Sequence, residues 1–355
     1  MSAALRNLMM LMATTPPVVP WSVPAAMNGS ATPAPMFGIA VNAAGLFVAV
    51  GNLFGGMTSD GPVAAYSSDG ITWSTPALMN GDTAPVYMFG VAVNTAGMFV
   101  AVGYRAGSGA VAAYSADGVT WSTPAFMNGS LAMTQMNSVA VNSAGLFVAV
   151  GYSHTDASAI HAHSADGIAW TTPASMNGST ENARMRGVTV NSAGLFVAVG
   201  NDGTTIKTAY SSDGISWSSP TVTGGLMNIG MVAVNAAGRF VTVGYSNIAG
   251  DGPVAMYSDD GATWSTPEYM NGSTATAFMQ SVAADTSGKF VTVGWNIDNF
   301  PVSAYSNDGI TWTTPARISG AAAVAYMDAV AVNVAGTFVA VGQNDANYPV
   351  SSYTL

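Results

Sequence analysis

The sequence predicts an all-β protein, a seven-bladed β-propeller with four antiparallel strands per blade, and two repeated phrases carry this prediction. The first, Tyr-Ser-x-Asp-Gly-x-Thr-Trp-Ser-Thr-Pro, returns with small changes about every 48 residues. The second, Val-Ala-Val-Asn-x-Ala-Gly-x-Phe-Val-x-Val-Gly, lies between its copies and occurs seven times with small changes. Short strands and glycine turns at such a period are typical of propellers, whose blades each hold four strands. Copies of the first phrase span 66–76, 114–124, 163–173, 210–220, 257–267 and 305–315.

The two ends of the chain share a seventh copy of the first phrase. Residues 349–355 hold its beginning, and Trp21-Ser22-Val23-Pro24 holds its ending. We therefore expect the N-terminal strand, at 20–24, to complete the last blade as its outer strand and to close the ring. Closure removes the open sheet edges that invite aggregation. The expected organisation is an N-terminal arm at 1–19 and a single propeller at 20–355, with blades 1 to 6 at about 36–316 and the rest of blade 7 at about 327–355.

The arm at 1–19 combines an apolar run with helical spacing. Its apolar residues Leu5, Leu8, Met9 and Met12 recur at the period of one helix face, which predicts a short amphipathic helix. A secretory signal is the alternative, although the apolar run is short and its basic region consists of one arginine. An apolar helix outside the ring must bury its face, so we expect these four residues to contact other protein subunits.

One blade illustrates the expected strands. The inner strand is expected at 38–41, the second at 46–51, the third at 63–67 and the outer strand at 72–76. Asparagine and glycine in the turn at 42–45 suit a short hairpin, because Asn bonds its own backbone and Gly adopts positive φ. The second strand is apolar on both faces because neighbouring blades pack face to face. A methionine opens the inner strand of six blades, where filling the core is favoured over a thioether metal site.

The turn between the third and outer strands resembles a known motif. Ser67-x-Asp69-Gly70-x-Thr72-Trp73 is similar to the Asp-box of sialidase-type and related propellers, with one residue fewer between Asp and Trp than the usual Ser-x-Asp-x-Gly-x-Thr-Trp. The resemblance extends over nearly the whole chain and implies propeller architecture rather than an activity. It implies a structural role for the box aspartates, which are Asp69, Asp117, Asp166, Asp213, Asp260 and Asp308.

Variation within the repeat indicates which face binds. Length and chemistry change most in the loops between the second and third strands (B–C) and in the connections from each outer strand to the next blade (D–A). Both emerge on one side, here called the loop face, and binding residues concentrate on loops held by a rigid scaffold. Aromatic side chains at the roots of these loops can stack on sugars, or they can simply fill space between loops. The candidate ligand or partner residues are Tyr104, Arg105, Tyr152, His154, Asp156, Arg186, Tyr245, Trp295, Asp298 and Asp345.

Composition excludes several classes of partner. The net charge is −10 with only eight Lys and Arg, so a nucleic-acid partner is not expected. The chain has no cysteine and no apolar stretch near the roughly 18 residues of a membrane span. No cofactor or metal is expected. His161 and His163 share a strand face and with Asp156 offer metal ligands, but substitution in the packing is the favoured interpretation.

The sequence does not predict an enzyme. Sialidase-type catalysis requires an arginine cluster and a Tyr–Glu pair, whereas the only glutamates here are Glu181 and Glu268. Paired carboxylates for other glycosidase chemistry are not adjacent in the sequence. We therefore expect a non-enzymatic surface or assembly module, extracellular or on a virion, such as a component of a bacteriophage particle or bacterial surface. A lectin-like propeller that binds cell-surface glycans is the alternative, and a glycosidase is third.

Overall fold

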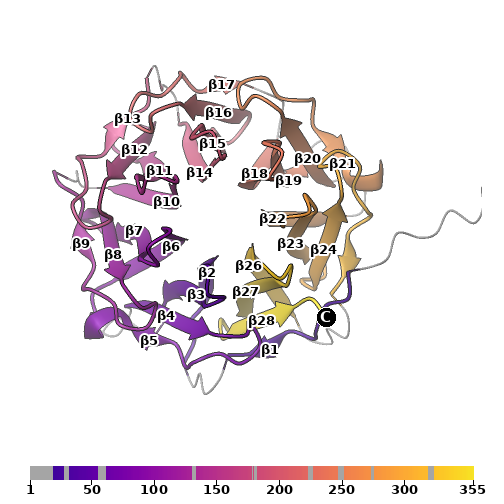
Figure 1. The fold of residues 1–355 in the computed structure, drawn as a ribbon, viewed down its shortest axis with the longest axis horizontal. Helices are drawn as coiled ribbons and strands as arrows, with labels where there is room; N and C mark the ends of the chain where they lie inside the picture. The colour runs from indigo at the N-terminus through magenta and orange to yellow at the C-terminus, as the bar shows by residue number, and fades with distance from the viewer. Residues whose placement is uncertain are drawn as a thin grey trace, which may run out of the picture.

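Seven four-stranded antiparallel sheets stand around a central channel in the computed structural model (Figure 1). The structure describes residues 19–27, 32–54, 61–129, 133–177, 179, 182–222, 227–246, 252–272, 276–318 and 324–355. The expected seven-bladed, all-β propeller is confirmed. The expected helix at 1–19 lies outside the described residues except for Val19. No helix in the described ranges has the length and apolar character needed to cross a membrane.

Each blade runs from the channel outward through four strands. The innermost strands are β2 (Met36–Val41), β6 (Val86–Val93), β10 (Thr134–Val141), β14 (Arg184–Val190), β18 (Met227–Val234), β22 (Ala277–Ala284) and β26 (Ala325–Val332). The second strands are β3 (Phe47–Asn52), β7 (Phe99–Arg105), β11 (Phe147–Ser153), β15 (Phe196–Asn201), β19 (Phe240–Ser246), β23 (Phe290–Asn296) and β27 (Phe338–Asn344). The third strands are β4 (Pro62–Ser67), β8 (Gly109–Ser115), β12 (Ser158–Ser164), β16 (Ile206–Ser211), β20 (Pro253–Ser258), β24 (Pro301–Ser306) and β28 (Pro349–Tyr353). The outer strands are β5 (Ala77–Leu78), β9 (Ala125–Phe126), β13 (Ala174–Ser175), β17 (Thr221–Val222), β21 (Glu268–Tyr269), β25 (Ala316–Arg317) and β1 (Ala25–Ala26), and two 3-10 turns lie at η1 (Met79–Gly81) and η2 (Met270–Gly272).

The hydrophobic core lies between blades rather than within one blade. Val48 and Val50 of blade 1, for example, pack with Met88, Phe99 and Trp121 of blade 2. The opening methionines are fully buried, so they belong to this core. Each blade thus completes its apolar surface on the next one, which favours a closed ring.

The N-terminal strand completes the last blade, as expected. β1 pairs with β28, and Trp21 forms a separate bridge with Thr354. The expected position at 20–24 is nevertheless wrong for the paired strand, which is Ala25–Ala26. Trp21 packs instead in the core between blades 6 and 7, where it is only 3% exposed.

The outer strands are shorter than expected and begin later. The strand predicted at 72–76 is found at Ala77–Leu78. The Thr72 amide donates to Asp69, and the Tyr66 amide donates to the Ser74 hydroxyl rather than to a strand carbonyl. Pro76 has no amide hydrogen to offer, so regular pairing starts after it.

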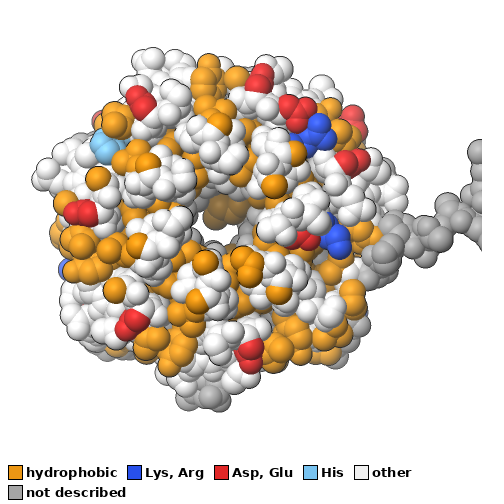
Figure 2. All heavy atoms as spheres, in the orientation of Figure 1, with side chains coloured by type: hydrophobic (Ala, Val, Ile, Leu, Met, Phe, Trp, Pro, Cys, Tyr) orange, Lys and Arg blue, Asp and Glu red, His pale blue; other side chains and the backbone are white. Residues whose placement is uncertain are grey.

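The turn between the first two strands follows its predicted chemistry. Asn42 Oδ1 accepts the amides of Ala44 and Leu46 at 3.0 and 2.9 Å. Gly45 has a φ of 87°, as this hairpin requires. We call the side of the ring that carries these turns the turn face. Figure 2 shows one face of the ring around its central opening, with hydrophobic and acidic side chains spread over the blades.

The aspartates in the turns between the third and outer strands also lie on the turn face, and they accept hydrogen bonds from the backbone of these turns. Asp213 Oδ1 accepts the amides of Ser216 at 2.7 Å and Ile215 at 2.8 Å, and the Ser211 hydroxyl at 2.9 Å. The amide bonds from Ser216 and Ile215 lower the pKa of Asp213 to about 2. Asp69, Asp117, Asp166, Asp260 and Asp308 accept equivalent bonds, and the pKa of each is lowered.

These carboxylates predict acid destabilisation. Because the pKa of Asp213 is near 2 in the fold and about 3.9 in an unfolded chain, its contribution is complete above about pH 4 and is lost as the pH falls through 2. We expect Asp213→Asn to lower the melting temperature at pH 7 and to reduce the further drop between pH 4 and pH 2. Melting curves across this range measure both effects, and parallel curves for the two proteins would contradict the assignment.

Candidate functional site at the channel opening

Every inner strand carries a β-bulge near its loop-face end. In blade 3, Met136 pairs with Gly151 and Ser138 pairs with Val150, which leaves Asn137 as the extra residue. Bulges re-aim a side chain out of the regular alternation. Here the extra side chains line the channel. The bulge residues around the ring are Phe37, Phe89, Asn137, Arg186, Gly230 with Met231, Gln280 and Asp328.

A glycine of the second strand makes room for each bulge. A Cβ on Gly151 would overlap the carbonyl oxygen of Gln135 and approach Met136. The same overlap with an inner-strand carbonyl exists at Gly51, Gly103, Gly200, Gly244, Gly294 and Gly342. The glycine that ends the second repeated phrase therefore has a packing role: it admits the backbone that turns one side chain into the channel.

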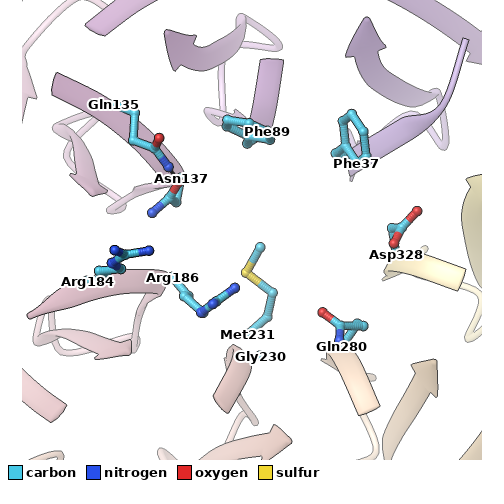
Figure 3. Close-up of a pocket in the computed structure, with 10 residues that line it drawn as sticks. All are labelled: Phe37, Phe89, Gln135, Asn137, Arg184, Arg186, Gly230, Met231, Gln280 and Asp328. Carbon is cyan, nitrogen blue, oxygen red and sulfur yellow. Dashed lines mark hydrogen bonds between the residues drawn. The ribbon is translucent and has the colours of Figure 1, made fainter. Parts of the chain in front are cut away.

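The bulge residues surround a cavity of about 380 Å³, shown in Figure 3. Gln135 and Arg184 complete its lining. Aromatic rings come from blades 1 and 2, amides and guanidinium groups from blades 3 and 4, and an amide and a carboxyl group from blades 6 and 7. Different sides of the opening therefore carry different chemical groups, although the backbone around it repeats seven times.

Two arginines stand together on β14. Arg184 and Arg186 are exposed within the opening, and neither forms an ion pair with any described residue. The Arg184 guanidinium lies over the Tyr152 ring at 4.6 Å. Although the Arg186 side chain reaches solvent, the surrounding channel walls desolvate it and lower its pKa, and the charge of Arg184 lowers it further. Both arginines also line an adjacent cavity of about 440 Å³ with Asn201 and Asp202.

Asp328 is the one carboxyl group among the residues that line the channel cavity. Burial raises the pKa of Asp328 to about 7, and the Gln343 amide, which donates to Asp328 at 3.4 Å, opposes this shift. Near neutral pH this group therefore exists in both its neutral and its charged form.

A network of polar groups fixes the amides beside the arginines. His154 Nε2 donates to Gln135 Oε1 at 3.2 Å, and Gln135 Nε2 donates to Asn137 Oδ1 at 2.7 Å. Asn137 Nδ2 then donates to the Met185 carbonyl at 2.7 Å, which links blade 3 to blade 4. His154, a residue predicted from the sequence, thus orients channel side chains.

The predicted loop-root aromatics pack against neighbouring rings. Tyr104 stacks on Tyr87 at 5.1 Å and on Phe89 at 5.8 Å, so it supports a ring that lines the channel. On the far side of the opening, ring contacts connect Tyr245 with Phe278 at 4.7 Å, Phe278 with Trp295 at 6.1 Å, and Trp295 with Tyr326 at 5.3 Å. Tyr152 is 4% exposed and offers no free face to a sugar, whereas the other three rings are half-buried.

The remaining predicted residues do not join the channel site. Arg105 forms an ion pair with Asp82 at 3.2 Å and lies over Phe126. Asp156 is exposed and bonds Ser153 in its own loop. The other two exposed loop aspartates are Asp298 and Asp345, neither of which lines the channel cavity.

His161, one of the blade 3 histidines considered as metal ligands, is packed in the protein interior. His161 is 8% exposed and its ring lies 6.0 Å from that of Trp217 in the next blade. Burial lowers the pKa of His161 to about 4, with a further contribution from His163. No group of three His, Cys, Asp or Glu side chains suited to a metal occurs in the part of the chain that the structure describes.

Of the bulge residues, only Arg186 was predicted as a site residue from the sequence. The sequence does mark the other bulge residues, because each follows the Met or Ile near the start of its inner strand. Between the opening Met (Ile229 in blade 5) and the nearly constant Val-Ala-Val segment, this position is Phe, Phe, Asn, Arg, Gly, Gln and Asp in successive blades. Variation at a position enclosed by repeated residues points to function in the same way as a variable loop.

Known proteins share the fold but little sequence. The chain matches no family model and no curated protein sequence. An ulvan lyase of polysaccharide lyase family 25, solved bound to -[GlcA(1-4)Rha3S]-, matches with a TM-score of 0.59 at 12% identity, over 95% of this chain and 94% of that one.

Two carbohydrate-active enzymes with longer chains match as well. A family 74 xyloglucanase from Xanthomonas campestris gives 0.58 at 15% identity, over 93% of this chain and 55% of its own, and a Hadza microbial sialidase gives 0.52 at 13%, over 94% and 65%. This chain thus spans less than two thirds of either. Together these likenesses show that the chain is a seven-bladed β-propeller with structural neighbours among lyase, xyloglucanase and sialidase propellers.

Proposed function

We propose that the protein is a non-enzymatic attachment module that binds carbohydrate at the loop-face opening of its channel. The observation that carries the proposal is the bulge position, where a repeated backbone aims a different side chain into one cavity from almost every blade. A scaffold that only filled its channel would gain nothing from this variety. Phe37, Phe89, Asn137, Arg186 and Gln280 instead resemble the mixture of rings and fixed polar groups that orients a small ligand.

The chemistry of the opening favours a sugar ligand. Phe37 and Phe89 lie 5.7 Å apart and are half-buried, so their rings offer apolar area for the faces of sugar rings. Amides and guanidinium groups on the neighbouring blades 3 and 4 suit hydroxyl and acidic substituents. The cavity volume of about 380 Å³ falls within the usual range for small-ligand sites, roughly 300–1,000 Å³. The three named neighbours, which act on carbohydrates by their titles, support the same class.

The titratable groups favour binding over hydrolysis. Glycosidases commonly use two carboxyl groups about 5–9.5 Å apart. Among the residues that line the channel cavity, Asp328 is the one carboxyl group. Attachment also agrees with the sequence-based expectation of a surface or assembly module, outside the cell or on a virion, for which the identity of the larger particle stays a prediction.

Glycan binding by paired double variants tests the proposal. Phe89→Ala with Gln280→Ala should lower affinity for the glycans that the full chain binds on an array by about tenfold or more. The melting temperature should change little, because both side chains are half-buried in the channel. The matched control is Ile71→Ala with Ile215→Ala on the turn face, where these side chains are 51% and 50% exposed.

Three results would contradict the proposal. They are an array without any bound glycan, equal loss of binding in the two double variants, and shortening of a bound glycan during incubation. The last would show an enzyme instead, and mass spectrometry of the recovered glycan detects it.

A further inference from the structure

We propose that the carbohydrate is acidic, and that Arg184 and Arg186 hold its anionic group, a carboxylate or a sulfate ester. This inference rests on the proposed function and specifies its ligand class. Three of the described basic side chains form ion pairs: Arg105 with Asp82, Lys207 with Asp202, and Arg239 with Asp259. Lys289 and Arg317 form none with a described residue but do not line the channel cavity, whereas Arg184 and Arg186 line it together.

Arg184 and Arg186 form no such pair with a described residue, although an acid lies near. Asp202 lines the adjacent cavity with both arginines. Its carboxylate is already occupied, because it accepts the amide and hydroxyl of Thr204 and of Thr205 and pairs with Lys207 at 3.1 Å. The two guanidinium groups therefore keep donors directed at the opening.

Placing two positive charges side by side in a confined opening is unfavourable. They repel each other, and burial lowers the pKa of Arg186. A bound anion would relieve both effects, since guanidinium groups form strong charge-assisted hydrogen bonds with carboxylates and with sulfate-like oxygens. The overall charge of −10 makes a local pair of unpaired cations more selective, because most other surfaces would repel an anion.

The surroundings orient Arg184 and leave Arg186 extended into the opening. Arg184 lies on the buried ring of Tyr152, and Arg186 reaches toward Met231 at the mouth of the channel (Figure 3). The hydrogen-bonded amides of Gln135 and Asn137 stand on the next blade. Because its guanidinium is already stacked on a ring, Arg184 loses less conformational freedom on binding, which increases affinity.

Asp328 makes the recognition depend on pH. Gln343 bonds its carboxyl group, and the groups that share the cavity with it from other inner strands are Phe37, Gln280 and the two arginines. The arginines stay charged through neutral pH. Burial and the charge of Arg184 lower the pKa of His154, which bonds Gln135 of the lining, so its ring is mostly neutral above pH 6.5 and Asp328 is the lining group that titrates near pH 7. Above its pKa of about 7 it adds a negative charge that repels an anion, so affinity for an acidic ligand should fall from pH 6 to pH 8.

Titration calorimetry with the full chain and four oligosaccharides of equal length tests the inference. The probes are an oligouronide, its carboxyl-reduced form, a sulfated oligosaccharide and its desulfated form. We expect at least one acidic probe to bind about tenfold tighter than its neutral partner. Arg184→Gln and Arg186→Gln should each remove that difference, and Arg186→Lys should restore part of it because it keeps the charge without the bidentate geometry.

Controls separate the site from general electrostatics. Arg239→Gln removes the same charge on the turn face and should keep the preference for the acidic probe. Asp328→Asn should abolish the fall in affinity between pH 6 and pH 8. Comparing the oligouronide pair with the sulfated pair shows whether the site prefers a carboxylate or a sulfate ester.

Two results would overturn the inference. Neutral probes that bind as tightly as acidic ones would refute acid recognition while leaving carbohydrate binding intact. An acidic preference that survives both glutamine variants, with melting temperatures unchanged, would place the anion elsewhere. Failure of all four probes, together with an empty glycan array, would instead refute the proposed function itself.

Discussion

Deletion of residues 1–24 will destroy the cooperative fold of the ring. It removes Trp21, which is 3% exposed in the core between blades 6 and 7. Loss of a buried tryptophan commonly costs about 3–5 kcal/mol, and a whole domain is stable by only about 5–15 kcal/mol. The deletion also removes Ser22, whose backbone and side chain bond Ser352 and Tyr353. We expect aggregation on size-exclusion chromatography and no sharp melting transition.

Deletion of residues 1–18 is the matched control. It leaves Val19 and all the described contacts of the N-terminal strand in place, so the melting temperature should stay near that of the full chain. If the shorter and the longer deletion melt alike and both remain soluble, the segment at 19–24 that leads into β1, with Trp21 and Ser22, does not stabilise the ring.

Gly151→Ala should have the second large effect. Its new methyl group would overlap the backbone carbonyl of Gln135, and neither strand can move away without breaking the β10–β11 pairing. Overpacking of this kind commonly costs about 1–3 kcal/mol and sometimes more. Because the obstacle here is backbone, we expect about 3 kcal/mol or more. The bulge that aims Asn137 into the channel would be displaced too, so ligand affinity should fall in any folded fraction.

Gly145→Ala in the same blade controls for the general cost of replacing a glycine. Gly145 has a φ of 88°, but a Cβ there meets no atom within 4 Å. It should cost about 1–2 kcal/mol, the usual penalty for a side chain in the left-handed region, without any effect on binding. Denaturant unfolding of both variants measures the difference. Equal losses would mean that backbone conformation, rather than overlap with the inner strand, explains the glycine.

The fold could be predicted because the local turn residues and the long-range repeat pattern indicate the same architecture. Hairpin residues such as Asn42 and Gly45 specify the turn, and the split phrase at the two ends specifies closure. The outer strands were harder to place. The residues predicted to begin these strands hydrogen-bond to the preceding turn instead, as the Thr72 amide does with Asp69. The segment at 72–76 is therefore not a strand, although its sequence suits one.

The site was only partly predictable. Period-two alternation describes the inner strand from Gly38 onward and fails at the bulge just before it, where the channel side chain is placed. The packing of Tyr104 on Tyr87 and Phe89 depends on the adjoining strand of the folded blade, which a consideration of loop roots alone does not include. Variation was the right criterion, but it applied to a strand position as well as to the loops.

The meeting of the chain ends gives the ring a polarity. Leu355 donates its amide to Pro20 at 2.8 Å, beside the bridge between Trp21 and Thr354 on the turn face of blade 7. The bulge residues open on the other side. A tether at the C-terminus, for example to a sensor surface, would therefore leave the channel mouth directed away from the support and accessible to its ligand.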